Sequence, residues 1–183
     1  MSLRLFAALA VPDSAAAPLM AIQDKVPGAR WRPRENLHLT LRFYGEVQEP
    51  VANDIAETLQ DIAARTSDFE VRIKGVGAFG RAEPHALIAK VEATPALEKL
   101  AADCEHAARR LGLKAETRKF TPHVTLAYLT DYVAYSDVNA FERAHALIAP
   151  PPFRAGAIGL YSSWQRKNAP GIYRLEADYS LSA

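Results

Sequence analysis

The chain has 183 residues, of which 49% are apolar and 23% charged, and its formal net charge is +1. These values are typical of a folded protein with a sizeable core, and we expect one domain over residues 1–183. The balance of 22 basic and 21 acidic residues excludes a strongly basic surface for gripping duplex nucleic acid. It leaves room for a local basic cleft that binds one nucleotide or a single-stranded end.

Cysteine content and the N-terminal sequence indicate a cytoplasmic protein. The one cysteine, Cys104, can form neither an internal disulfide nor a thiolate metal site. The apolar run near the N-terminus is too short to span a membrane and lacks a clear signal-peptide pattern. We therefore expect no membrane partner, and the polar balance gives no reason to expect more than a monomer.

Apolar periodicity predicts alternating strands and helices. Strands are expected at 3–10, 36–44, 69–79, 86–91, 122–129, 153–161 and 172–179, and helices near 19–26, 51–62, 95–111 and 137–148. The third helix has the strongest signals, with Thr94 as N-cap, Pro95 at its first position and Gly112 after its end. Close spacing of neighbouring strands favours antiparallel pairing, which predicts an α+β fold.

A four-residue motif occurs twice. His38-Leu39-Thr40-Leu41 reappears as His123-Val124-Thr125-Leu126, 85 residues later and close to half the chain. This separation fits a duplication into two lobes, each with an antiparallel sheet, related by a pseudo-two-fold axis and facing a central cleft. Because side chains alternate along a strand, each histidine shares a face with its threonine, whereas the apolar residues face helices on the outside.

Two histidines and two threonines in one cleft suit phosphodiester chemistry. Displacement at phosphorus needs a base for the nucleophile and an acid for the leaving oxygen, and histidine can serve as either near neutral pH. Threonine hydroxyls can donate to the non-bridging oxygens. By the same alternation Arg42 would face the phosphate, and Tyr44 would lie where it could stack on a base. Arg118, just before the second motif, is a further candidate for phosphate contact.

A single H-x-T-x in a strand is more often structural than catalytic. Two copies with matching alternation make coincidence a weak explanation. No carboxylate or third histidine lies on these strand faces, so the sequence predicts no metal and no cofactor.

The paired motifs resemble those of the two-histidine (2H) phosphoesterase superfamily, and within it the RNA 2′,3′-cyclic phosphodiesterases, formerly called 2′-5′ RNA ligases or LigT-like proteins. The resemblance extends over nearly the whole chain, including the segments 4–6, 30–31, 35–38, 41–46, 75–79, 120–123, 160–162 and 171–173. One departure is Tyr128, where this family commonly has Arg; by strand alternation Tyr128 would point away from the His123 side.

The resemblance implies hydrolysis of 2′,3′-cyclic phosphates at RNA ends to 2′-phosphomonoesters, without metal. It implies that His38 is the proton donor and His123 the proton acceptor, with Thr40 and Thr125 holding the phosphate. RNA ends or small cyclic nucleotides would be the substrates, and ATP or another nucleotide could occupy the cleft. From the residues alone, the symmetry of the motifs does not say which histidine is acid and which is base.

Two alternatives stay open. The same groups could hydrolyse another cyclic or 2′-5′-linked nucleotide, with weak reverse ligation of RNA ends. A non-catalytic module that binds RNA ends is the alternative from another class, although such a module has no need of a second matched histidine.

Overall fold

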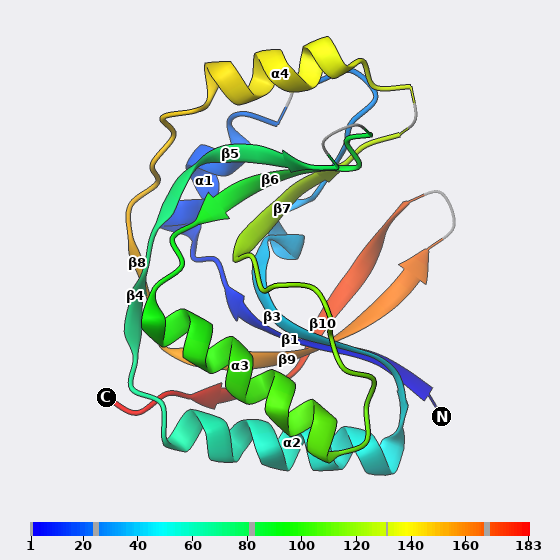
Figure 1. The fold of residues 1–183 in the computed structure, drawn as a ribbon, viewed down its shortest axis with the longest axis vertical. Coiled ribbons are helices and arrows are strands. Elements are labelled where there is room, and N and C mark those ends of the chain that lie inside the picture. The colour runs from blue at the N-terminus through cyan, green and yellow to red at the C-terminus, as the bar shows by residue number, and fades with distance from the viewer. Residues whose placement is uncertain (1, 24–25, 81–82, 131, 167–168) are drawn as a thin grey trace.

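The structure, a computed structural model, describes residues 2–23, 26–80, 83–130, 132–166 and 169–183, and it has the predicted α+β fold (Figure 1). Its strands are β1 (Ser2–Ala10), β2 (Arg30–Trp31), β3 (His38–Gln48), β4 (Phe69–Val71), β5 (Ile73–Phe79), β6 (Ala86–Val91), β7 (His123–Tyr128), β8 (Phe153–Ala155), β9 (Ala157–Arg166) and β10 (Ala169–Ser180). Its helices are α1 (Asp13–Met20), the 3-10 turn η1 (Arg34–Asn36), α2 (Glu49–Ala64), α3 (Pro95–Arg110) and α4 (Tyr135–Ala144).

The main sheet is antiparallel and curled. Its strands follow the order β10–β9–β1–β3–β7–β6–β5, and β2 pairs with β7. The first four strands form one half and β7, β6, β5 and β2 form the other. β3 and β7 are joined by a single residue pair, Leu39 opposite Val124. The two expected sheets are thus two halves of one sheet that meet between the two motifs.

The helices cover the outer face of this sheet. In Figure 1, α2 and α3 lie along the half that contains β1 and β3, and α4 lies along the half that contains β5. The predicted cap of α3 is present, since the Leu97 backbone N–H donates to Thr94 Oγ1 at 3.3 Å. The face that the helices cover is the one to which the alternation in the motifs assigned the apolar residues.

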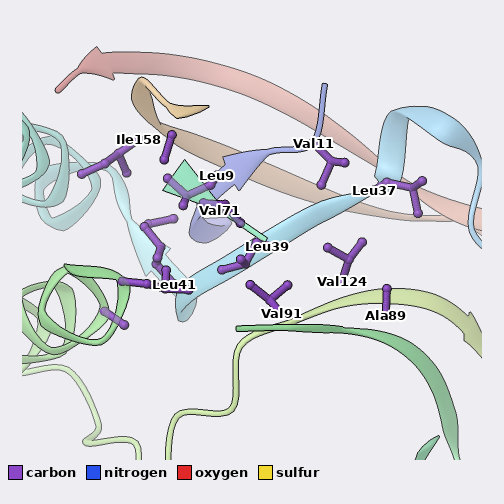
Figure 2. Packing of buried hydrophobic residues seen from close by; sticks show 14 of the residues in the cluster. Leu9, Val11, Leu37, Leu39, Leu41, Val71, Ala89, Val91, Val124 and Ile158 are labelled. Atoms are coloured by element: carbon purple, nitrogen blue, oxygen red, sulfur yellow. The ribbon is translucent and has the colours of Figure 1, made fainter. Parts of the chain in front are cut away.

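The core passes without a break between the two halves. Leu39 and Val124 are both fully buried, and Figure 2 shows them with Val91 in one apolar cluster. Burial of a leucine of this kind stabilises the fold by roughly 1.5–3 kcal/mol. The packed core therefore fixes the position of the residues that flank Leu39 and Val124, including both motif histidines.

Three predicted elements differ from those observed. The expected strand at 153–161 divides at Gly156 into β8 and β9, which belong to different sheets. The expected strand at 69–79 divides at Arg72 into β4, which pairs with β8 in a separate small sheet, and β5. The expected helix at 19–26 instead begins at Asp13 and contains Pro18. Its buried Ala15, Ala16 and Leu19 supply packing that offsets the hydrogen bond lost at the proline. No helix in the described part of the chain is both long and apolar enough to cross a membrane.

Each motif strand contains a β-bulge immediately after its threonine. Thr40 lies opposite Ala8 and Arg42 opposite Ala7, so Leu41 is the extra residue in β3. In β7, Thr125 lies opposite Ile88 and Ala127 opposite Leu87, so Leu126 is the extra residue. A bulge reverses the side-chain alternation of the strand beyond it. The residues just after each motif, 42–44 in β3 and 127–128 in β7, therefore point to the opposite side from the one that simple alternation predicts.

Candidate active site

His38 and His123 begin neighbouring strands and point to the same side of the sheet. Each directly precedes a member of the Leu39–Val124 pair, and equivalent positions around such a pair share a face. We call this side, which carries His38, Thr40, His123 and Thr125, the histidine face. The structure thus brings together the four motif residues that the sequence singled out.

Both imidazoles are held in the same way. His38 Nδ1 lies 2.9 Å from the Asn36 carbonyl oxygen, and His123 Nδ1 lies 2.7 Å from the Thr121 carbonyl oxygen. A carbonyl oxygen only accepts hydrogen bonds, so each Nδ1 is the protonated nitrogen and donates. This leaves Nε2 of both rings available for proton transfer.

His38 lies among aromatic rings. Its ring centroid is 4.8 Å from that of Phe6 and 5.1 Å from that of Tyr173, the latter edge-on. The pKa of His38 is lowered from 6.5 to about 4, chiefly by burial; the charges of Arg32 and His123 act in the same direction, whereas the bond to Asn36 opposes the change. In the unliganded protein His38 is therefore neutral at pH 7.

His123 has a more open environment. Phe79 meets its ring edge-on, with centroids 4.7 Å apart. Burial lowers the pKa of His123 as well, and the charge of Arg118 acts in the same direction. His123 is also neutral at pH 7 and can accept a proton.

The predictions that Arg42 contacts phosphate and that Tyr44 stacks on a base are wrong. The bulge at Leu41 turns Arg42 to the helix side, where its Nε lies 2.5 Å from Glu105 Oε2 of α3. Its Nη2 donates to the Lys114 carbonyl oxygen at 2.5 Å. Tyr44 is 9% exposed and belongs to the apolar core near Cys104. Arg42 instead fixes the segment that leads toward the second motif.

The same bulges place two other aromatic side chains on the histidine face. Phe43 lies opposite Phe6, which contacts His38, and Phe43 is 41% exposed. Tyr128, the equivalent residue of β7, is 40% exposed, and the expectation that it points away from the His123 side is wrong. Each ring has an arginine over it: Arg4 lies 5.0 Å from the Phe43 centroid and Arg32 5.4 Å from that of Tyr128.

Arg118 lies where the sequence placed it, in the segment before β7. Its side chain is 85% exposed and forms an ion pair with Glu116, with Nη2 and Oε2 2.9 Å apart. Its effect on the pKa of His123 places its charge near that ring. It remains a candidate for substrate contact.

Arg32 is a residue of this site that the sequence did not predict. This residue lies between β2 and η1 and is 6% exposed, and its guanidinium lies over the rings of Tyr128 and Tyr173. Arg32 follows directly on segment 30–31, but no local pattern marked it, because Tyr128 and Tyr173 come from distant parts of the chain. Within the described residues, no three His, Cys, Asp or Glu side chains gather closely enough to hold a metal ion.

Comparison with known proteins identifies the family. The sequence pattern of the 2′-5′ RNA ligase superfamily matches residues 11–166. The chain therefore belongs to this superfamily of 2H phosphoesterases.

Curated relatives carry the name RNA 2′,3′-cyclic phosphodiesterase. The Aeropyrum pernix protein is 40% identical over 95 residues, which is 51% of this chain and 53% of that protein. The Thermus thermophilus protein is 34% identical over 134 residues, which is 68% of each chain. The chain thus matches about half the length of the A. pernix relative.

Solved structures share the fold. The protein TT0787 of Thermus thermophilus superposes with a TM-score of 0.82 at 25% identity, over 98% of both chains. LigT of E. coli, solved in complex with 3′-AMP, superposes with a TM-score of 0.78 at 22% identity, over 100% of both chains. The chain therefore shares its overall fold with these two proteins.

Proposed function

We propose that this protein hydrolyses the 2′,3′-cyclic phosphate at RNA ends to a 2′-phosphomonoester, with His38 and His123 as the acid–base pair and without a metal. The observation that carries the proposal is the matched pair of imidazoles on one face, each with Nδ1 bonded to a backbone carbonyl and Nε2 available. The name shared by the curated relatives supports the choice of substrate.

The reaction needs one proton acceptor and one proton donor. Neutral His123 accepts a proton from water as the water oxygen attacks phosphorus, and His38 gives a proton to the leaving 3′ oxygen as its bond to phosphorus breaks. Because His38 is neutral in the free protein, it must gain its proton as substrate binds. A phosphate anion beside the ring favours the charged form and so raises the pKa of His38.

The proposal assigns the phosphate to the two threonines. Thr40 and Thr125 follow their histidines by two residues on the same face, so that one hydroxyl comes from each half of the sheet. Hydroxyls that donate to the non-bridging oxygens stabilise the charge that builds there in the transition state. Arg118, at the surface beside His123, would contribute positive charge at the rim of the site.

The ligand class is a nucleotide or RNA end. LigT, which shares the fold, has been solved with 3′-AMP, with ATP and with NADP+. On the histidine face, the exposed rings of Phe43 and Tyr128 provide flat apolar surfaces of the kind on which bases stack. We infer that this face takes a nucleobase beside the phosphate.

The deciding experiment is product analysis with an oligonucleotide that ends in a 2′,3′-cyclic phosphate, in excess EDTA. The proposal requires ring opening to a 2′-phosphate at a rate that EDTA does not change. A 3′-phosphate product would mean that the 2′ oxygen leaves, and loss of activity in EDTA would contradict the metal-free reaction. Binding without turnover would favour a module that only binds RNA ends.

A further inference from the structure

Arg32 is a buried cation whose charge has no partner in the described structure. Arg32 is 6% exposed, and its Nη2 atom is buried without a hydrogen-bond partner. No carboxylate forms an ion pair with it among the described residues. A charged group removed from water is costly unless an opposite charge or hydrogen bonds compensate for it. An anion would compensate this charge.

The guanidinium is held in a fixed place. Its Cζ atom lies 5.0 Å from the ring centroid of Tyr173 on β10 and 5.4 Å from that of Tyr128 on β7. The Arg32 backbone N–H donates to the Leu126 carbonyl oxygen at 2.7 Å, and this carbonyl belongs to the bulge of the second motif. Aromatic faces suit the weakly hydrated guanidinium and leave its edge free to donate. Arg32 thus contacts both halves of the sheet.

Arg32 lies next to the catalytic pair. Tyr173, which it contacts, meets the His38 ring edge-on at 5.1 Å. The positive charge of Arg32 also contributes to the lowered pKa of His38, which requires the two groups to be close. An anion that Arg32 binds is therefore within the space that the acid–base pair serves.

We propose that Arg32 is the principal phosphate-binding cation of this site, and that its unpaired Nη2 donates to a non-bridging oxygen of the substrate. This inference rests on the proposed function and adds to it the residue that recognises the anion. A cyclic phosphate diester carries one negative charge, which matches the one positive charge of the Arg32 guanidinium. Arg118 is a poorer candidate because it is 85% exposed and already paired with Glu116.

The arrangement also explains how His38 becomes protonated. In the free protein the Arg32 charge opposes a second positive charge on His38. When phosphate binds Arg32, this charge is compensated and a negative charge is added beside the ring, so that the pKa of His38 rises. Phosphate binding and charging of the proton donor thus become one event.

The test compares Arg32→Met and Arg32→Lys with Arg34→Met as the matched control. Arg34 is in the same segment but forms an ion pair with Asp13 at the surface. We expect Arg32→Met to lower kcat/KM for the cyclic-phosphate oligonucleotide on the order of 10²-fold, as when one transition-state donor is removed. Arg32→Lys should lower kcat/KM less than Arg32→Met, because lysine keeps the positive charge but lacks the bidentate donor geometry of the guanidinium. Arg34→Met should leave kcat/KM unchanged.

Two further measurements do not depend on turnover. Titration of 3′-AMP against adenosine should show that Arg32→Met loses the preference for the phosphorylated ligand and keeps the affinity for adenosine. NMR titration without ligand should show that the pKa of His38 rises in Arg32→Met and stays low in Arg32→Lys. If the unaltered protein opened no cyclic phosphate, the proposed function would fail, while the 3′-AMP titration would still test Arg32.

The outcome that would overturn the assignment is specific. It is a folded Arg32→Met or Arg32→Lys variant that binds 3′-AMP, and turns over substrate, within about threefold of the parent protein. Circular dichroism and thermal unfolding establish which variants are folded. If Arg32→Met does not fold, the comparison is made with Arg32→Lys.

Discussion

β3 and β7 present their histidines in the same way, but the two imidazoles have different surroundings. Both rings donate from Nδ1 to the carbonyl two residues earlier, and both strands bulge after the threonine. Around His38 there are three aromatic rings, those of Phe6, Tyr161 and Tyr173, and the charge of Arg32, whereas His123 has Phe79 and the exposed Arg118. Similar backbones therefore place the two imidazoles in different surroundings, as the proposed division into proton donor and proton acceptor needs.

The largest effect should come from removal of either histidine. We expect His38→Ala and His123→Ala each to lower kcat by about 10²- to 10⁴-fold, because each removes one proton-transfer group. Turnover is measured by the opening of the cyclic phosphate. His106→Ala, at an exposed position of α3, is the control and should leave kcat unchanged. If one alanine variant kept full activity, the two strands would not share the chemistry.

The two strands also differ directly after their bulges, at Arg42 and Ala127. Arg42 pairs with Glu105, and their side chains are 9% and 17% exposed. Arg42→Met should destabilise the protein by about 3 kcal/mol, since it leaves the Glu105 carboxylate with Arg109 as its remaining cation and the Lys114 carbonyl without its donor. Urea unfolding measures this change. Arg42→Met/Glu105→Met should recover stability; an active, fully stable Arg42→Met would instead point to a dispensable pair.

The lowered pKa of His38 predicts how stability depends on pH. The unfolded chain takes up a proton near 6.5 and the folded protein only near 4, so stability is complete above about pH 6.5 and is lost as the pH falls toward 4. The loss attributable to His38 is about 3 kcal/mol at most. Urea unfolding at pH 7 and pH 4.5 should show a smaller decline in His38→Gln than in the parent. An equal decline would mean that His38 titrates normally.

The threonines test whether the two halves hold the phosphate equally. Thr40→Val and Thr125→Val keep the shape of the side chain and remove the hydroxyl. Each should lower kcat/KM on the order of 10²-fold with little change in stability. Unequal losses would identify the half that carries more of the transition-state charge.

The smallest effects are expected at the exposed aromatic pair. Phe43→Ala and Tyr128→Ala should each weaken nucleotide binding by about 1–3 kcal/mol if a base stacks on that ring. Titration with 3′-AMP and with ribose 5-phosphate separates base from phosphate contacts. The ring that carries the base should affect only the first ligand; no effect at either ring would place the base elsewhere.

Much of the fold follows from local sequence, and so do the four motif residues. Thr94, Pro95 and Gly112 delimit α3 because capping depends on neighbouring residues. The bulges at Leu41 and Leu126 could not be predicted from the local sequence. Apolar and polar residues alternate regularly through each motif, and the bulges arise from a register shift in the pairing with a neighbouring strand. Arg42, Tyr44 and Tyr128 were assigned to the wrong face for this one reason.

Arg32 shows a different limit of local reasoning. Its environment forms only when η1 is held beside β10, where Asn36 Nδ2 donates to the Gly171 carbonyl oxygen at 2.9 Å. A buried arginine over two tyrosines is a tertiary feature, and no spacing along the chain marks it.

The single pair Leu39–Val124 has a consequence for the history of the chain. A two-fold axis passes through any antiparallel strand pair, and here it relates one motif to the other. Two identical half-length subunits that paired through this strand would form a symmetric dimer, with one histidine and one threonine from each. Fusion of the two copies into one polypeptide would then release them from identity, so that only one histidine needed to acquire an arginine and an aromatic enclosure.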